Sequence, residues 1–392
     1  MPTGPRSTLS EALAADLDQV EADGLWRELR EVESAQEPAV LLRGQEVLLF
    51  CSNNYLGLAN HPEVVEASRE AAARFGASAG SSRLISGHMS PHRELEERIA
   101  SWKGVAASLV FSTGYQANLG AITSLVGPDD VVLSDELNHA SIIDATRLAR
   151  GATRVFRHND LDHLETLLKA SDGAGRVLIA TEAIFSMDGD AAPLAEMGAL
   201  ARRYGAWLLV DEAHSVGVFG QDGAGLVDEL GIDELVDVRV GTLGKALGSF
   251  GAYVAGSRSL IDLLVNRARS FIFTTGLPPS AVAAASAAIA ICQREPKLGV
   301  ALRGRVRELA GRLREVGLDV PHAQSQILPV RIGDSARTVE LMQQLLEDGI
   351  YVAAIRPPTV PKGTSRLRFS VMASHSPRQL DRAVEALTRR CS

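Results

Sequence analysis

The stretch WLLVDEAHSVG, residues 207–217, decides the fold. Its first four residues are all apolar, and an acid and then a histidine follow them. A short run that is apolar throughout is typical of a strand buried on both faces of a parallel sheet. Ligands of an open α/β sheet gather at the carboxyl ends of its strands. Asp211 and His214 are therefore candidate binding residues.

Six further apolar runs lie on either side of this one, separated by segments with helical spacing. They are residues 107–111, 130–133, 153–156, 176–181, 238–241 and 251–254. This alternation predicts an α/β fold in which helices cover a mostly parallel sheet.

The two ends of the chain predict smaller parts. Apolar residues at helical spacing over 9–33 predict one or two amphipathic helices lying on the surface, and short β-type runs follow them. Near the other end, an alanine-rich buried helix, an amphipathic helix and three strands predict a small α+β unit. We expect a helical arm with short strands over 1–50, a large domain over 51–282 and a small domain over 283–392.

Composition argues against several classes of protein. With 46% hydrophobic and 22% charged residues, the chain can bury an ordinary globular core. Its net charge of -8 disfavours a general affinity for nucleic acid or anionic membranes. Three widely spaced cysteines without a C-x-x-C pair suggest neither a zinc site nor a redox site. The beginning of the chain lacks the pattern of a targeting peptide. We expect a cytoplasmic protein without a bound metal or membrane span.

A single lysine stands between glycines after another predicted strand, in TLGKALG at 242–248. Small neighbours leave room around Lys245, and burial promotes loss of its proton, as a Schiff-base lysine requires. Asp211 could keep a bound pyridine nitrogen protonated, and His214 could bond a ring oxygen. The same Asp-Glu-x-His run also suits a nucleotide site, a metal site or a helix cap.

Three more polar clusters follow predicted strands. FSTGYQAN at 111–118 opens a helix whose first amides could bind phosphate, although Ser112 could equally cap that helix. DELNHAS at 135–141 brings His139, whose flat ring could stack on a ligand or serve only the structure. TEAIFSMDGD at 181–190 brings Glu182 and Ser186, and its acids do not have EF-hand spacing. Together the clusters supply the groups that pyridoxal 5'-phosphate (PLP) requires.

Over residues 25–387 the sequence resembles the α-oxoamine synthases, a branch of the fold-type I PLP enzymes. The matching strings, in the same order, are SNNYLGL, GSSRLISG, FSTGYQAN, DELNHASIIDA, TEAIFSMDGD, VDEAHSVGVFG, TLGKALGSFG, FIFTTGLPP and PPTVPKGTSRLRFS. The resemblance implies a PLP-binding large domain, a small C-terminal α+β domain and a homodimer with shared active sites.

The resemblance also implies a role for each site residue. Lys245 would hold PLP as a Schiff base and act as acid and base, Asp211 would pair with the ring nitrogen, and His139 would stack on the ring. His214 and Ser186 would address the ring oxygen. Thr242 and Glu182 would lie beside the lysine. The phosphate would be held by Ser112, Gly114 and Tyr115, together with Thr274 and Thr275 of the partner subunit.

For the substrates, Arg368 matches the arginine that grips an amino-acid carboxylate, and Asn53 lies near the same substrate. IRPPTVP at 355–361 looks like the 8-amino-7-oxononanoate synthases of biotin biosynthesis. Those enzymes join L-alanine to a pimeloyl thioester, on coenzyme A or a carrier protein. Arg356 is then a candidate for recognising the acyl chain or a carboxylate, or is a surface residue, and Arg27 a candidate for the anionic part of the thioester.

Two other functions stay open. A sister synthase would use glycine and another acyl-CoA on the same residues. A non-catalytic scaffold subunit of a hetero-oligomer would be expected to lack the lysine, whereas Lys245 is present. A nicotinamide dehydrogenase is disfavoured because no G-x-G-x-x-G follows an early strand.

Overall fold

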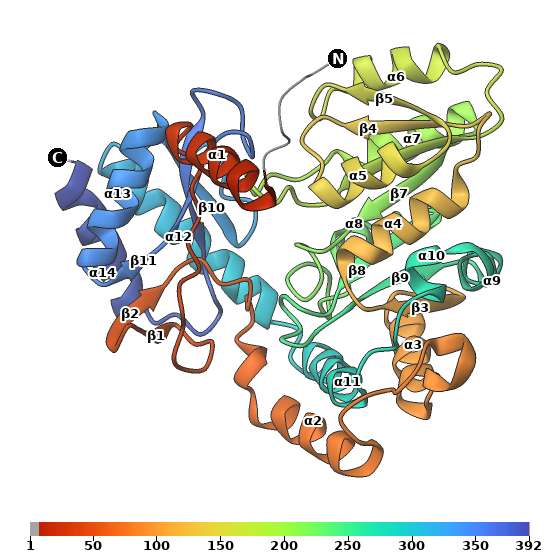
Figure 1. Cartoon of the computed structure of the whole chain (residues 1–392), viewed down its shortest axis with the longest axis horizontal. Helices are drawn as coiled ribbons and strands as arrows, with labels where there is room; N and C mark the ends of the chain where they lie inside the picture. Colours follow the sequence, from red (N-terminus) through yellow and green to blue (C-terminus); the bar gives the residue numbers. More distant parts are fainter. Residues whose placement is uncertain (1–7, 392) are drawn as a thin grey trace.

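A seven-stranded sheet lies at the centre of the larger part of the chain in the computed structural model, which describes residues 8–391 (Figure 1). Its strand order is β3-β9-β8-β7-β6-β4-β5, and only β9 runs antiparallel to its neighbours. The strands are β3 (Ala107–Phe111), β4 (Val131–Asp135), β5 (Ala152–Phe156), β6 (Val177–Glu182), β7 (Trp207–Asp211), β8 (Val238–Thr242) and β9 (Ala252–Gly256). The predicted α/β fold with a mostly parallel sheet is confirmed.

Helices cover both faces of this sheet, which explains why its strands are apolar throughout. Along β7, Leu209 packs into one core cluster, whereas Leu208 and Val210 pack into the other. The first cluster is completed by α4 (Gly114–Leu125), α5 (Ala140–Leu148), α9 (Arg258–Arg267) and α10 (Arg269–Ile272). The second is completed by α3 (Ser90–Trp102), α6 (Leu161–Lys169), α7 (Leu194–Tyr204) and α8 (Leu226–Leu230).

The register of the sheet brings the polar clusters to one edge. β3 is parallel to β8, β7, β6 and β4, because two antiparallel pairings through β9 restore its direction. Glu182 at the end of β6 pairs with Asp211 at the end of β7. The loops after these five strands therefore leave the sheet on the same side, where a ligand can meet several of them.

A second body is built from the C-terminal segments and the β1–β2 hairpin (Figure 1). One sheet has the order β10-β13-β12, from β10 (Ile327–Gly333), β12 (Ala353–Ile355) and β13 (Ser365–Ser370). The other joins β1 (Ala39–Leu42) and β2 (Gln45–Leu49) to β11 (Ile350–Tyr351). The helices here are α12 (Leu298–Glu315), α13 (Ser335–Glu347) and α14 (Pro377–Cys391). The domain boundaries given above stay a prediction.

Two further helices connect the bodies. α11 (Pro279–Arg294) packs against α2 (Pro62–Phe75) and α3. α11 contains the predicted alanine-rich helix, and eight of its residues are buried. Short helical turns occur at η1 (Leu58–Asn60), η2 (Arg83–Gly87) and η3 (Asp233–Leu235).

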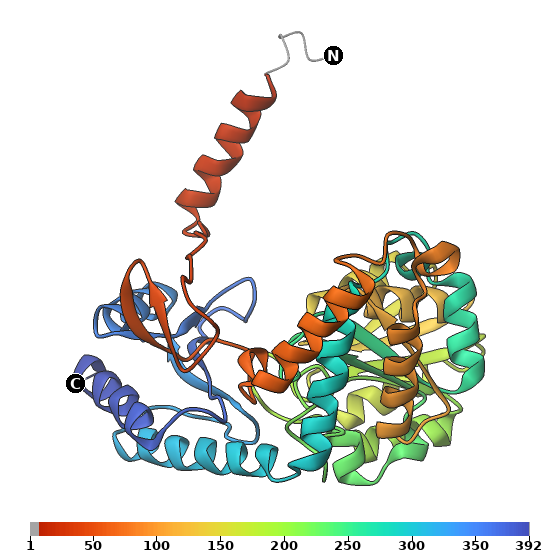
Figure 2. The same ribbon diagram turned by 90° about the horizontal axis from the view of Figure 1, so that it is seen from below.

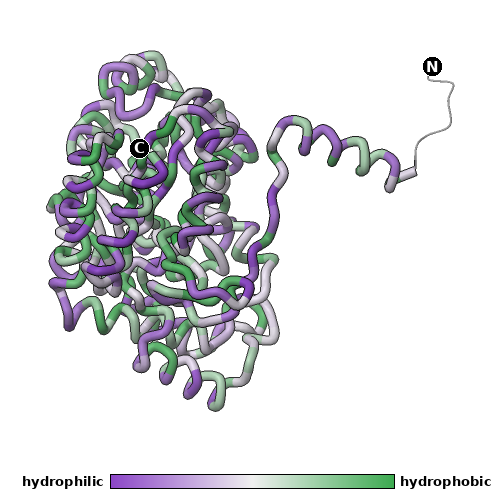
Figure 3. Tube along the Cα trace, turned by 90° about the vertical axis from the view of Figure 1, so that its left-hand side faces the viewer, coloured by the Kyte–Doolittle hydropathy of each residue, from purple (hydrophilic) through white to green (hydrophobic). Residues whose placement is uncertain are grey.

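The N-terminal arm differs from the prediction. α1 (Leu9–Ala22) has no buried residue and extends away from the rest of the chain, so it does not lie on the surface of the protein (Figure 2). Hydrophilic and hydrophobic positions alternate along it (Figure 3). The apolar spacing beyond it does not form a helix, because Gly24 takes a left-handed φ of 64° and the Leu25 amide bonds back to the Val20 carbonyl at 2.8 Å. This Schellman-type turn ends the helix.

Candidate active site

Lys245 lies in the loop after β8 and starts a chain of hydrogen bonds. Its Nζ is 2.8 Å from Nε2 of His214, and Nδ1 of His214 is 2.7 Å from the hydroxyl of Tyr55. The Tyr55 hydroxyl donates to Oδ1 of Asn53 at 2.9 Å. Because that hydroxyl has one proton, Nδ1 of His214 must be the donor to it, which leaves Nε2 to accept from the lysine. His214 is thus neutral, in line with the pKa that burial and the Lys245 charge hold well below 6.5.

The Asp211 carboxylate is buried at the end of β7 and is held by two donors. Asn118 on α4 donates to its Oδ2 at 2.7 Å, and the Ala213 amide donates to its Oδ1 at 2.9 Å. The same Asn118 amide group donates to the Ser141 hydroxyl at 2.9 Å. The carboxylate is therefore fixed in orientation, as a partner for a ligand cation must be.

Three titratable groups beside this carboxylate have shifted pKa values. Burial lowers the pKa of Lys245 from 10.5 to about 8. Burial, and then the charge of Asp211, raises the pKa of Glu182 from 4.5 to about 8. Burial also lowers the pKa of His139, which caps α5 and bonds the Ser141 hydroxyl at 2.8 Å. Near neutral pH the site therefore favours a protonated Glu182 carboxyl and gives Lys245 a much larger neutral fraction than an ordinary lysine has.

Glu182 is buried and its Oε1 has no hydrogen-bond partner in the structure. Its backbone amide is bound by Oδ1 of Asn138 at 3.1 Å. Buried polar atoms are rarely left unpaired, so this oxygen indicates a place for a further group.

The residues predicted to hold a phosphate lie at the start of α4. Thr113 caps this helix by accepting from the Gln116 amide at 3.1 Å, and Gly114 is its first residue. Ser112 bonds the carbonyl of Thr275 of the same chain at 3.4 Å. Tyr115 is 43% exposed, and its hydroxyl donates to Asp144 at 2.7 Å. The structure thus brings Ser112, Gly114 and Thr275 together.

Thr242 shapes the loop that carries the lysine. Its hydroxyl donates to the Gly251 carbonyl at 3.2 Å and accepts from the Gly244 amide at 3.2 Å. Thr274 is half-buried and Thr275 is exposed. That these two threonines contact the phosphate from the partner subunit stays a prediction.

Arg368 is buried on β13 and reaches the Lys245 cluster through Tyr55. Its Nη2 is 3.5 Å from the Tyr55 hydroxyl, and its Nε donates to the Ser186 carbonyl at 2.6 Å. Arg366, two residues earlier, forms an ion pair with Asp188. Arg368 thus reaches the Tyr55 hydroxyl beside Lys245, whereas Arg366 pairs with an acid of the loop that carries Ser186.

The remaining two predicted substrate residues lie together, away from this cluster. The Arg356 guanidinium donates to the carbonyls of Gly24 and Trp26, the latter at 3.2 Å. It thereby holds the segment that carries Arg27, which is exposed. Within residues 8–391 no hydrogen bond joins either arginine to Lys245.

Sequence reasoning missed three residues of the site. Tyr55 and Asn118 lie within the motifs SNNYLGL and FSTGYQAN, but no function was predicted for either. Gln326, 112 residues after His214, donates to the His214 carbonyl at 2.8 Å. Asn118 lies one helical turn after Gly114, and a polar residue on that inner face was a usable signal. Nothing in the local sequence marks Gln326.

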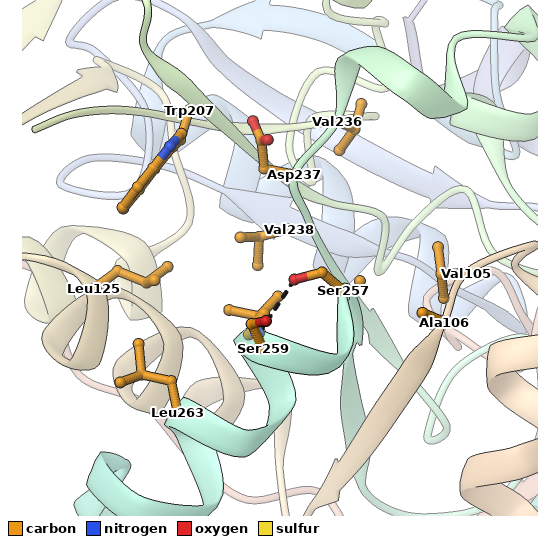
Figure 4. Close-up of a pocket in the computed structure, with 12 residues that line it drawn as sticks. Val105, Ala106, Leu125, Trp207, Val236, Asp237, Val238, Ser257, Ser259 and Leu263 are labelled. Atoms are coloured by element: carbon orange, nitrogen blue, oxygen red, sulfur yellow. Dashed lines mark hydrogen bonds between the residues drawn. The ribbon is translucent and has the colours of Figure 1, made fainter.

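A cavity of about 490 Å³ lies at the opposite edge of the sheet (Figure 4). It is lined by the first residues of β7 and β8, including Trp207 and Val238, and by Leu263 of α9. These positions are the amino ends of the parallel strands, so the cavity is separate from the Lys245 cluster.

Comparison with known proteins gives matches over nearly the whole chain. The 8-amino-7-oxononanoate synthase of Geobacter sulfurreducens is 49% identical over 385 residues, 97% of this chain and 98% of that protein. The enzyme of the same name from Anaeromyxobacter dehalogenans strain 2CP-1 is 50% identical over 375 residues, 96% of this chain and 94% of that protein. Both are similar in length as well as in sequence.

Solved structures agree with these matches. Serine palmitoyltransferase of Sphingomonas wittichii has a TM-score of 0.92 and 34% identity, covering 98% of both chains. The 8-amino-7-oxononanoate synthase of Francisella tularensis has a TM-score of 0.75 and 25% identity, covering 88% of this chain and 98% of that one. The profile of aminotransferase class I and II matches residues 45–387. The chain therefore belongs to the aminotransferase class I and II family, and its identity to the 8-amino-7-oxononanoate synthases puts it in the α-oxoamine synthase branch.

Proposed function

We propose that the protein is an acyltransferase that condenses L-alanine with a pimeloyl thioester. The products are 8-amino-7-oxononanoate, CO2 and the free thiol, coenzyme A or the carrier protein, in a step of biotin biosynthesis. The observation that carries the proposal is the Lys245–His214–Tyr55 chain beside the Asp211 carboxylate. The names of the relatives support the choice of substrates.

The residues at this edge of the sheet fit PLP, which is bound in a solved serine palmitoyltransferase with a TM-score of 0.92. Asp211, oriented by Asn118, would pair with the ring nitrogen, and the unpaired Oε1 of Glu182 would take a partner from the bound cofactor. Further cofactor contacts would come from Ser112, Gly114, Tyr115, His139, Ser186, His214, Thr242, Thr274 and Thr275. When bound, PLP supplies an electron sink for charge that develops at the α-carbon of the amino acid.

The protein's own groups would orient the amino acid and move its proton. Arg368 would hold the carboxylate of alanine, since a guanidinium binds carboxylates in a bidentate manner. Lys245, with its pKa lowered to about 8, can take the α-proton as a neutral amine. Neutral His214 can accept a hydrogen bond from that amine at 2.8 Å. Asn53 would contact the substrate from beside Tyr55.

The thioester would enter near Arg27 and Arg356. Both carry positive charge, and Arg356 fixes the backbone next to Arg27. Phosphates of coenzyme A or of a carrier-protein arm would suit these guanidinium groups.

We also propose that the protein is a cytoplasmic homodimer. Large apolar side chains near Thr274 and Thr275 are exposed in the single chain, namely Ile85 (81%), Phe250 (54%) and Phe273 (70%). Burial of such side chains against a second copy would remove them from water. Within the described residues, no helix has the length and hydrophobicity needed to cross a membrane.

Product identification tests the proposal. Purified protein is incubated with PLP, alanine or glycine, and acyl-CoAs of different chain lengths, and the products are weighed by mass spectrometry. Alanine with pimeloyl-CoA is expected to give 8-amino-7-oxononanoate, and Lys245→Ala none. A preference for glycine with another acyl-CoA would instead establish the sister synthase. Borohydride treatment that leaves the cofactor on a residue other than Lys245, or on none, would contradict the site.

A further inference from the structure

His158, in the loop after β5, lies between two carboxylates, one at the end of β4 and one in the loop after β6. Its Nδ1 is 3.0 Å from Oδ1 of Asp135, and its Nε2 is 2.8 Å from Oδ2 of Asp190. The side chain of Asp135 is fully buried and that of Asp190 is 10% exposed. Because both ring nitrogens face carboxylate oxygens, both must donate, and the ring is a cation.

The surroundings of His158 fix its orientation. Its ring meets Phe185 edge-on, with centroids 4.4 Å apart and planes at 90°. Its backbone amide donates to Glu136 at 2.9 Å. Burial alone would lower its pKa, but the bonds to Asp135 and Asp190 outweigh burial and raise the pKa to about 10. The charged form therefore persists at any physiological pH.

The carboxylate of Asp135 is hydrogen-bonded to the turn at residues 136–139. Asp135 accepts from the Leu137 amide at 2.8 Å and from the Asn159 amide at 3.0 Å. This turn ends in His139. Asp135 thus ties the turn to the loop after β5.

The other carboxylate lies in the loop at residues 183–191, which carries Ser186. The Asp190 carbonyl accepts from the Phe185 amide at 3.0 Å, which closes this loop on itself. The C-terminal body holds the loop from the other side, since the Ser325 hydroxyl donates to the Gly189 carbonyl at 2.8 Å and Arg368 donates to Ser186. A shift of Asp190 would therefore reach Ser186 and Arg368.

We propose that His158 is a positioning residue that locks the 136–139 turn to the 183–191 loop and so sets His139, Ser186 and Arg368 relative to one another. Without the imidazolium two buried carboxylates would face an unfilled space and repel each other. This inference rests on the proposed roles of His139 and Ser186.

His158→Gln tests the lock in the full chain. Hydrogen exchange in the cofactor-free protein is expected to rise at the 136–139 turn and the 183–191 loop, but not in α4 or α9. PLP is expected to bind at least about tenfold more weakly, the size of effect seen when an outer partner of a site residue is lost. The KM for alanine should rise, because Arg368 contacts the same loop. A lower melting temperature with unchanged exchange in both segments and unchanged PLP affinity would overturn the proposal.

Three variants make the result specific. His163→Gln removes a nearby ring that accepts from the Arg157 amide at 3.0 Å, and should change neither exchange nor PLP affinity. His158→Gln with Asp190→Asn removes one of the two unpaired charges, and with it their mutual repulsion, and should recover part of the loss. If His158→Gln does not fold, Asp190→Ala alone removes the acceptor that His158 bonds in the 183–191 loop, and unchanged exchange at 183–191 would then refute the lock.

Failure of the proposed function gives a different pattern. If His139→Ala and Ser186→Ala bind PLP as tightly as the unaltered protein, their assignment to the cofactor is wrong. The exchange result on the cofactor-free protein would still stand, because it does not depend on that assignment.

Discussion

Lys245 is expected to be an unusually reactive amine in the cofactor-free protein. Burial is the main cause, because it removes water from the charged form. The carboxylates of Asp211 and Glu182 oppose this effect, whereas the Arg368 charge adds to it. The balance puts the pKa at about 8, below the ordinary value of 10.5.

The size of the effect follows from this difference. It corresponds to about 3 kcal/mol in favour of the neutral amine. Near pH 7 roughly one Lys245 side chain in ten is then neutral, compared with about one in three thousand for an ordinary lysine. A free amine at this population can react with an aldehyde cofactor without a strong external base.

Competitive labelling with acetic anhydride across pH 6–11 measures this directly. The peptide that contains Lys245 is quantified by mass spectrometry against one that contains Lys169, an exposed lysine on α6. Lys245 labelling should reach half its maximum near pH 8. Asp211→Asn should move this midpoint down, because it removes a stabilising anion, and Arg368→Met should move it up.

A midpoint for Lys245 at or above pH 10 would refute the reasoning. The lysine would then be solvated or paired with a carboxylate, and its use as a base near neutral pH would need the cofactor to be present. Opposite shifts in the two variants would show that the charges around the amine have been placed wrongly.

Three more outcomes follow from buried groups. Lys103→Met leaves Glu212 buried without its ion-pair partner, since both side chains are 0% exposed, and should lower the free energy of unfolding in urea by about 3–5 kcal/mol. Asn118→Ala removes the donor to Oδ2 of Asp211 and should weaken PLP binding, measured by fluorescence titration, by about tenfold. The pKa of Glu182 is raised to about 8, so the folded state binds more protons than the unfolded state between pH 4.5 and 8. Relative to Glu182→Gln, the unaltered protein should lose stability as pH rises through that window and level off above it.

The sheet could be predicted from the sequence because its strands are buried on both faces. Each of the seven apolar runs became a strand, with ends that differ by at most two residues. The direction of β9 could not be predicted, since an antiparallel strand covered on both faces has the same apolar pattern as a parallel one. Its reversal matters for the site, because it makes β3 parallel to β8 and brings Ser112 to the edge that holds Lys245.

The arm shows where apolar spacing misleads. Leu25, Leu29 and Val32 continue the helical period, yet Gly24 ends the helix before them. Leu29 is fully exposed, so no packing energy favours a second helix. A glycine that takes a left-handed φ ends a helix, and three apolar residues after it do not extend the helix when they have no surface to pack on.

The parts of the site that escaped prediction share one physical cause. Lys245 and Asp211 can be selected from the local sequence, because their residue types suit the chemistry and each lies at or just after the end of a predicted strand. Tyr55, Gln326 and His158 each bond a partner that is distant in sequence, 159, 112 and 32 residues away. A hydrogen bond over such a separation depends on the register of elements that have no sequence relation to each other. The structure was therefore needed to find these three orienting residues, whereas the sequence was enough to select Lys245 and Asp211.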